Sequence, residues 1–453
     1  MRTTFALFAL AAAMFVCGFD AGDRAAANAA PVLAPTPPMG WNSWDSYGAA
    51  VREENVRANT DYMAAHLAKY GWNYIVVDIQ WYEPHAQGHD YRAGAVLRMD
   101  QYGRLLPTEN RFPSAANGAG FKSLANYVHA HGLKFGIHIL RGIPRQAVGQ
   151  NTPIAESRYR AADVADKKNV CRWNTDMYGI DMSKPGAQDY YNSIVALYAS
   201  WGVDFIKADD MSSPYHGEEI AALHRAIVRS GRQIVLSLSP GPAPLDHAAE
   251  LQANAQMWRI SDDFWDDWKL LRHQFDLTRD WAPQIGKNGT WPDADMLPLG
   301  KLRITDKNGT DKTHFTPDEQ QTVMTLWSIA RSPLIVGGDL PSNDAATTAL
   351  ITNPEVLAVD RHSSANHQAF ERQSIRAWVA DAPGGGHFVA VFNLGDTEQS
   401  AKLKWTDVGL KAGSFTVRDL WKEKNSEKND GLNVPLRAHA SALYRVYDSG
   451  GGM

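Results

Sequence analysis

This chain of 453 residues contains few cysteines, no long basic run and, after its N-terminal region, no apolar run of membrane-spanning length. A bilayer-spanning helix needs about 20 consecutive apolar residues, so we expect the rest of the chain to be soluble. The net charge is −5 and no basic stretch stands out, which argues against a nucleic-acid partner. Hydrophobic residues make up 44% of the chain and charged residues 21%, a balance typical of a globular protein.

Residues 1–30 have the pattern of a secretory signal peptide. The apolar run 5–16 is too short to span a bilayer, and the cleavage point stays open between Gly18 and Ala29. Removal of this segment would take away Cys17 and leave Cys171 as the single cysteine, which excludes an intrachain disulfide. An export signal on a chain without disulfides predicts a bacterial periplasmic or secreted protein.

Eight short apolar runs alternate with amphipathic segments between about residue 37 and residue 355. Continuous hydrophobicity is typical of parallel strands that are buried on both faces, and the segments between them have helical periodicity. Glycines stand where several of these helices should end. The pattern predicts a (β/α)8 barrel, or TIM barrel. The predicted strands are 39–44, 74–81, 134–140, 203–209, 233–239, 257–263, 291–296 and 334–338.

After Asp360 the pattern changes to period-two alternation, which is clearest in 388–392 and 442–446. Glycine-rich turns separate these segments, so an antiparallel β domain is predicted. The expected organisation is a signal peptide over 1–30, a catalytic barrel over 31–360 and the β domain over 361–449. The predicted β-domain strands are 369–379, 386–394, 400–406, 414–422 and 432–447.

The active site of such a barrel lies at the carboxyl ends of its strands. The polar residues expected there are mainly acidic or aromatic, with Lys and Arg among them. No glycine-rich phosphate loop, HExxH motif or His and Cys cluster accompanies them, so neither a cofactor nor a metal is predicted. They include Trp44, Asp78, His138, Lys207, Asp209, Ser239, Arg259, Asp263 and Asp295.

Two carboxyl groups on either side of a sugar are the minimum for glycoside hydrolysis. Asp209 follows Lys207 by two residues, so both lie on one strand face, and the ammonium group would favour the ionised nucleophile. Asp263, on the sixth strand across the barrel mouth, suits the general acid/base. Spacing alone leaves these roles open, because Asp at strand ends also caps helices.

Five motifs follow one another along the chain, beginning with PPMGWNSW at 37–44 and including the segments that end at Asp209 and Asp263. In this order they resemble the motifs of glycoside hydrolase family 27, which contains α-galactosidases and α-N-acetylgalactosaminidases. The first, PPMGWNSW, resembles the opening signature of the family. The others resemble the nucleophile strand ending at Asp209, the acid/base segment ending at Asp263, and the seventh and eighth strands. The five segments are 37–44, 201–209, 258–263, 291–297 and 332–340.

The resemblance extends over nearly the whole mature chain and implies a C-terminal β-sandwich after the barrel. It implies a retaining exo-glycosidase that removes terminal α-D-galactosyl residues by double displacement, without a metal. Asp209 would be the nucleophile and Asp263 the acid/base. A carbohydrate is the expected partner, and the oligomeric state stays open. The expected substrate-binding residues are Trp44, Asp78, Ile79, His138, Lys207, Ser239, Arg259 and Asp295.

Several departures from the family pattern concern the sugar. Asp78 matches the first of two Asp at the end of strand 2, but Ile79 replaces the second and cannot accept a hydrogen bond from a 6-hydroxyl. Because β-L-arabinopyranose is α-D-galactose without the hydroxymethyl group, a β-L-arabinopyranosidase is an alternative. Ser239 replaces a Glu that contacts the 2-hydroxyl, which keeps an α-N-acetylgalactosaminidase open. His138 stands where many members of the family have Tyr. Met211 replaces the Cys that forms the family's disulfide beside the site.

Segment 141–186 is long and polar. It is either a surface excursion or a source of further site contacts, including one that replaces the missing carboxylate near Ile79. The residues of this segment that we consider for further site contacts are Arg141, Trp173, Asp176 and Tyr178. From another functional class, a catalytically inactive carbohydrate-binding protein on the same fold is a remote alternative. The presence of both carboxyl groups with their Lys and Arg neighbours argues against it.

Overall fold

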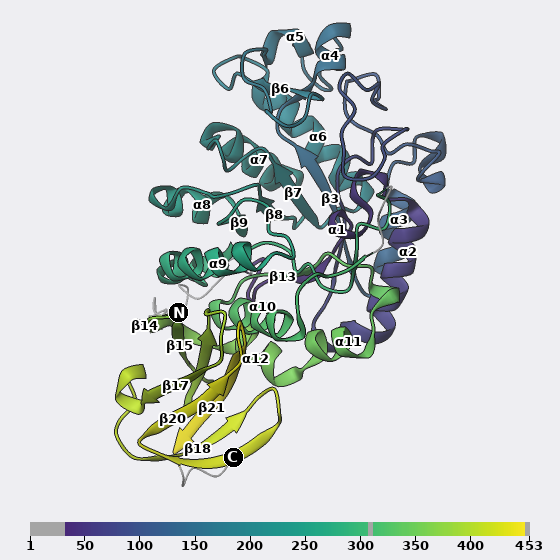
Figure 1. Cartoon of the computed structure of the whole chain (residues 1–453). Coiled ribbons are helices and arrows are strands. Elements are labelled where there is room, and N and C mark those ends of the chain that lie inside the picture. Colours follow the sequence, from purple (N-terminus) through teal and green to yellow (C-terminus); the bar gives the residue numbers. More distant parts are fainter. Residues whose placement is uncertain (1–31, 307–310, 449–453) are drawn as a thin grey trace, which may run out of the picture. The chain divides into compact units, whose positions relative to one another are not determined.

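The computed structural model describes residues 32–306 and 311–448 (Figure 1). The predicted signal peptide, its cleavage point and Cys17 lie outside these described residues. Within them, no helix is both long enough and apolar enough to cross a membrane.

Eight parallel strands form one sheet in the order β10-β9-β8-β7-β3-β2-β1-β13. A parallel bridge between Leu297 and Val336 joins the chain that follows β10 to β13, and the Leu297 N–H donates to the Ile335 carbonyl at 2.7 Å. This closure confirms the predicted (β/α)8 barrel. The strands are β1 (Met39–Asn42), β2 (Tyr74–Val77), β3 (Lys134–Leu140), β7 (Phe205–Asp209), β8 (Val235–Leu238), β9 (Met257–Arg259), β10 (Trp291–Asp293) and β13 (Leu334–Val336).

Helices follow the barrel strands, as the periodicity predicts. In α7 the residues Ile220, Leu223 and Ile227 repeat at three- and four-residue intervals and are all buried. Thr316 caps α10 and Glu319 completes its capping box. The main helices are α1 (Trp44–Tyr47), α2 (Glu53–Tyr62), α3 (Lys122–Ala130), α6 (Ala187–Trp201), α7 (Gly217–Ser230), α8 (Ala248–Asn254), α9 (Trp268–Trp281), α10 (Pro317–Ala330), α11 (Ala345–Thr352) and α12 (Pro354–His362).

The C-terminal strands form two antiparallel sheets, β14-β15-β16-β21-β18-β19 and β17-β20, which confirms the predicted β-sandwich. Side chains such as Val391, Leu403 and Val434 make up a core of their own. The domain boundaries given above stay predictions. The strands are β14 (Ser364–Arg372), β15 (Ile375–Asp381), β16 (His387–Asn393), β17 (Gln399–Lys404), β18 (Ser414–Asp419), β19 (Lys424–Asn429), β20 (Gly431–Leu436) and β21 (Ser441–Asp448).

Three details of the predicted β-domain strands are wrong. The expected strand 369–379 is a hairpin, because Gln373 has a φ of 53° and turns the chain between β14 and β15. The expected strand 432–447 is two strands, β20 and β21. The sequence reading missed β19, since all six of its side chains are polar and exposed and show no alternation.

The predicted long segment 141–186 is folded against the barrel. It contains a small sheet of β4 (Ile143–Pro144), β6 (Met177–Ile180) and β5 (Ala165–Asp166), with α4 (Arg145–Gln150) and α5 (Ala161–Val164). The buried Arg141 guanidinium holds its start, because it lies 2.7 Å from both Asp210 and Glu219 carboxylates. The segment is therefore not a loose surface excursion.

Candidate active site

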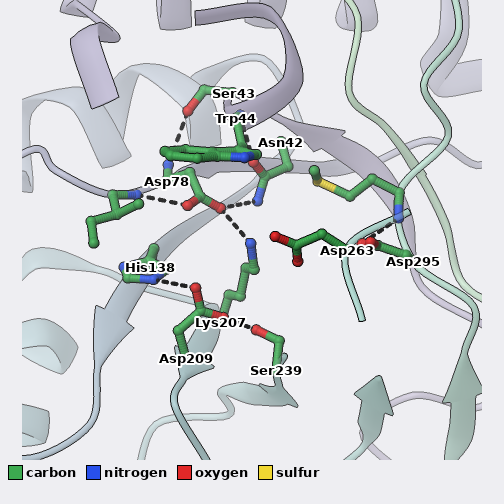
Figure 2. Close-up of polar contacts among 12 residues, drawn as sticks. Asn42, Ser43, Trp44, Asp78, His138, Lys207, Asp209, Ser239, Asp263 and Asp295 are labelled. Carbon is green, nitrogen blue, oxygen red and sulfur yellow. Dashed lines mark hydrogen bonds and ion pairs between the residues drawn. The ribbon is translucent and has the colours of Figure 1, made fainter. Parts of the chain in front are cut away.

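A cavity of about 510 Å³ lies at the carboxyl ends of the barrel strands. All of the predicted site residues line it except His138 and Ser239, which lie behind Asp209. Figure 2 shows the side chains of Asp78, Lys207 and Asp263 directed toward a common space. The lining residues are Trp44, Asp45, Asp78, Ile79, His89, Tyr91, Trp173, Lys207, Asp209, Pro240, Arg259, Asp262, Asp263, Phe264, Trp265, Asp295 and Met296.

The Asp78 carboxylate is held by three donors at the end of β2 (Figure 2). Its Oδ2 accepts hydrogen bonds from Asn42 Nδ2 at 2.7 Å and from Lys207 Nζ at 2.9 Å. Its Oδ1 accepts from the Ile79 N–H at 2.8 Å. The Asp78 N–H in turn donates to Ser43 Oγ at 2.9 Å. This fixed carboxylate and the ammonium beside it can bind neighbouring sugar hydroxyls.

Asp209 ends β7, and two side chains next to it form hydrogen bonds with its carboxylate. His138 Nε2 lies 2.8 Å from its Oδ2, and the Ser239 hydroxyl donates to its Oδ1. Burial alone would raise the pKa of Asp209, but the Lys207 ammonium and His138 outweigh burial and hold this pKa well below its ordinary value. The expected effect of Lys207 on Asp209 is therefore exerted through its charge, since its hydrogen bond goes to Asp78.

Asp263 occupies a different environment after β9. Its side chain is 66% exposed, and its only ion pair among the described residues is with Arg259 Nη2 at 3.2 Å. The same nitrogen lies 2.7 Å from Asp295 Oδ2, which also accepts from the Phe264 N–H. Burial, together with Asp263 and Asp293, raises the pKa of Asp295 to about 7, against the opposing charge of Arg259. Among the carboxyl groups of the cavity, Asp209 is therefore buried and kept ionised, whereas Asp263 is accessible to solvent.

Ile79 forms an apolar part of the wall beside the charged Asp78. It is 1% exposed and lines the cavity. Segment 141–186 does not replace the missing carboxylate, because Trp173 is its only residue among those that line the cavity. Asp176 of that segment is buried and accepts from Gln80 Nε2 at 2.6 Å and from the Tyr82 hydroxyl at 3.1 Å.

Sequence reasoning missed most of an aromatic wall at one side of the cavity. Trp44 stacks on Tyr91 with ring centroids 5.8 Å apart, and Tyr91 meets Trp173 at 5.5 Å. His89 packs edge-on against Trp44 at 5.0 Å. Tyr91 and His89 come from the segment after β2, which carries no motif or periodicity that marks it. The buried Asp45 was also missed, although it directly follows the opening motif.

Comparisons with known proteins find one family for the barrel and for the β-sandwich. The sequence matches the family model described as alpha galactosidase A over residues 36–184 and 178–362. It also matches the model of the alpha galactosidase C-terminal beta sandwich domain over residues 372–446.

Individual relatives match along almost the entire chain. A GH27 β-L-arabinopyranosidase structure from Geobacillus stearothermophilus is 50% identical, covers 93% of this chain and 98% of its own, and has a TM-score of 0.91. An alpha-galactosidase from Coffea arabica is 29% identical over 91% of this chain and 94% of its own length. Alpha-galactosidase A from Cellvibrio japonicus is 25% identical over 93% and 95%. Taken with the match of both barrel and sandwich, these findings show that the chain is a glycoside hydrolase of the α-galactosidase family, family 27.

Proposed function

We propose that this glycoside hydrolase is a retaining exo-β-L-arabinopyranosidase. The observation that carries the proposal is the buried Ile79 in the cavity wall next to Asp78. A hydroxymethyl group on the sugar would meet an aliphatic side chain there, where its hydroxyl finds no acceptor from Ile79. An arabinopyranoside has no such group, so its apolar ring edge suits this wall.

One relative supports the same substrate. The Geobacillus stearothermophilus protein that shares 50% identity with this chain is described as a β-L-arabinopyranosidase, and a variant of it was solved in complex with arabinose. Relatives described as α-galactosidases share 25–29% identity in the examples from Cellvibrio japonicus and Coffea arabica.

The proposed mechanism assigns one role to each carboxyl group. The Asp209 carboxylate, kept ionised by Lys207 and His138, attacks the anomeric carbon while the Asp263 carboxylic acid protonates the leaving oxygen. The Asp263 carboxylate then takes a proton from a water molecule as this water attacks the anomeric carbon. The bond between the sugar and Asp209 breaks, which regenerates the Asp209 carboxylate and the Asp263 carboxylic acid. The solvent-accessible position of Asp263 allows this exchange with water.

An α-galactosidase is the second candidate. Asp78, Lys207 and Arg259 would bind the hydroxyls that galactose shares with L-arabinopyranose, so we expect galactosides to be hydrolysed as well. We expect this hydrolysis to be slower, because Ile79 offers no acceptor to the 6-hydroxyl of galactose. The cavity gives less support to the α-N-acetylgalactosaminidase alternative. The Ser239 hydroxyl donates a hydrogen bond to Asp209, and Ser239 does not line the cavity. The space that an acetamide would need is therefore not provided by Ser239.

Steady-state kinetics on nitrophenyl β-L-arabinopyranoside, α-D-galactopyranoside and N-acetyl-α-D-galactosaminide test the proposal. The highest kcat/KM is expected for the arabinopyranoside, and NMR of the first-formed product should show retained anomeric configuration. A higher kcat/KM for either other sugar would refute the substrate assignment, and an inverted product would refute the mechanism.

We further propose that the chain is exported to the periplasm or the medium, supported by the signal-like residues 1–30. N-terminal sequencing of protein from fractionated bacterial cells tests this. Cytoplasmic protein with an intact N-terminus would contradict it.

A further inference from the structure

Asp45 is a buried carboxyl group of the cavity that has no part in the mechanism above. It lies in α1, immediately after the opening motif, lines the cavity and is 1% exposed. Its Oδ2 has no hydrogen-bond partner among the described residues. Residue 337 must be glycine for this carboxyl group to fit, because a Cβ there would collide with Oδ2. The fold thus makes room for a polar side chain that the protein itself leaves unpaired.

The charges around Asp45 are mainly negative. Burial raises the pKa of Asp45 well above its ordinary value, and the Asp295, Asp263 and Asp78 carboxylates raise it further, against the single opposing charge of Lys207. This shift favours the neutral carboxylic acid, which has one O–H to donate. An unpaired buried donor is unfavourable, so a hydroxyl group that enters the cavity and pairs with it gains free energy.

We propose that Asp45 is a sugar-binding residue, whose carboxyl group hydrogen-bonds to a ring hydroxyl of the bound pyranose. This inference rests on the proposed function, since it takes the cavity to be the sugar site. A hydroxyl group can accept from the acid O–H or donate to its carbonyl oxygen, so either matches a pyranose. The charged neighbours of Asp45 are Lys207 in β7, Asp78 after β2, and Asp263 and Asp295 after the paired strands β9 and β10, so Asp45 belongs to the same polar surface.

Calorimetric titration of the purified enzyme with L-arabinose, and in parallel with D-galactose, tests the proposal. Asp45→Ala should raise the Kd for the sugar about 3- to 10-fold, the loss expected for one neutral hydrogen bond. Asp45→Asn should restore the Kd to within about twofold of wild type, because the amide both donates and accepts. The melting temperature of Asp45→Ala should not fall, since the protein offers Oδ2 no hydrogen bond to lose.

Ser46→Ala is the matched control. Ser46 lies on the same helix and also has a buried oxygen without a partner, but it does not line the cavity. Its substitution should leave sugar binding unchanged. Wild-type Kd values in a folded Asp45→Ala would overturn the proposal, as would a loss of binding that is equal in Ser46→Ala.

If Asp45→Ala does not fold, the pH dependence of binding decides. Wild-type affinity should change as Asp45 ionises with rising pH, and Asp45→Asn should lose this component of the change. The same pH dependence in both proteins would overturn the proposal. Failure of the proposed function would look different, because wild type would then bind galactose more tightly than arabinose while both sugars still depended on Asp45.

Discussion

Replacement of Ile79 by Asp tests the physical basis of sugar selection most directly. Ile79 is 1% exposed and borders the charged end of β2, so a carboxylate introduced there faces the bound sugar with little solvent screening. It would supply an acceptor for the 6-hydroxyl of a galactoside. An arabinopyranoside has no such hydroxyl and gains nothing.

The magnitude follows from the surroundings. A hydrogen bond to a charged group contributes about 1.5–3 kcal/mol, which corresponds to roughly 10- to 150-fold in kcat/KM. The new carboxyl group would lie beside the Asp78 carboxylate, and Lys207 already donates to Asp78 at 2.9 Å, so little cationic charge is left for it. We therefore expect the lower end, about a 10-fold shift of the kcat/KM ratio toward the galactoside. The loss of aliphatic burial should also lower the melting temperature.

The assay compares kcat/KM for the two nitrophenyl glycosides in wild type and variant. The ratio cancels effects common to both substrates, including partial unfolding. Ile79→Val is the control that keeps the wall apolar, and its ratio should stay within about twofold of wild type. An unchanged ratio in a folded Ile79→Asp would show that Ile79 does not border the 6-position, and the arabinopyranosidase proposal would lose its main support.

Three further predictions concern Asp209 and Cys171. Asp209→Asn should lower kcat on an activated glycoside by on the order of 10³-fold or more, because no glycosyl ester can form; turnover within tenfold of wild type would refute its role. The lowered pKa of Asp209 stabilises the fold above the ordinary carboxyl pKa, and this contribution is lost as pH falls. The difference in unfolding free energy between wild type and Asp209→Asn, measured by urea denaturation, should thus become smaller from about pH 5 to pH 3. A difference that stays constant over this range would contradict the lowered pKa of Asp209. Burial, with Asp210 nearby, raises the pKa of the Cys171 thiol to about 12, so this thiol should react with a disulfide reagent near pH 8 only after unfolding. Because Cys171 is a free cysteine, dithiothreitol should leave the activity intact. Inactivation by dithiothreitol would show that the enzyme depends on a disulfide.

The sequence alone was enough to predict the barrel and the location of its site. The barrel strands are buried on both faces, so they are largely apolar, as β2 is throughout, and the polar residues at their ends, such as Asp209 in β7, mark the site end of the sheet. The motifs around Asp209 and Asp263 predicted the family, and the departure at Ile79 was visible without any structure. The catalytic roles of the two Asp stay predictions.

Tertiary structure decided which groups act on each other. Lys207 donates to Asp78 across 129 positions of sequence, and His138 and Ser239 reach Asp209 from two other strands. Local sequence carries no signal for such pairings, since side chains from separate strands meet only when the barrel closes.

The same reason explains the residues that sequence reasoning overlooked. The Trp44–Tyr91–Trp173 wall joins three distant segments, and the Asp45 carboxyl group fits in its position only because Gly337, just after β13, has no side chain. In the β-sandwich, β19 is a strand because it pairs with β18, although its polar residues show no alternation. Periodicity records which faces are buried, whereas hydrogen-bond partners and close approaches depend on the three-dimensional closure of the fold.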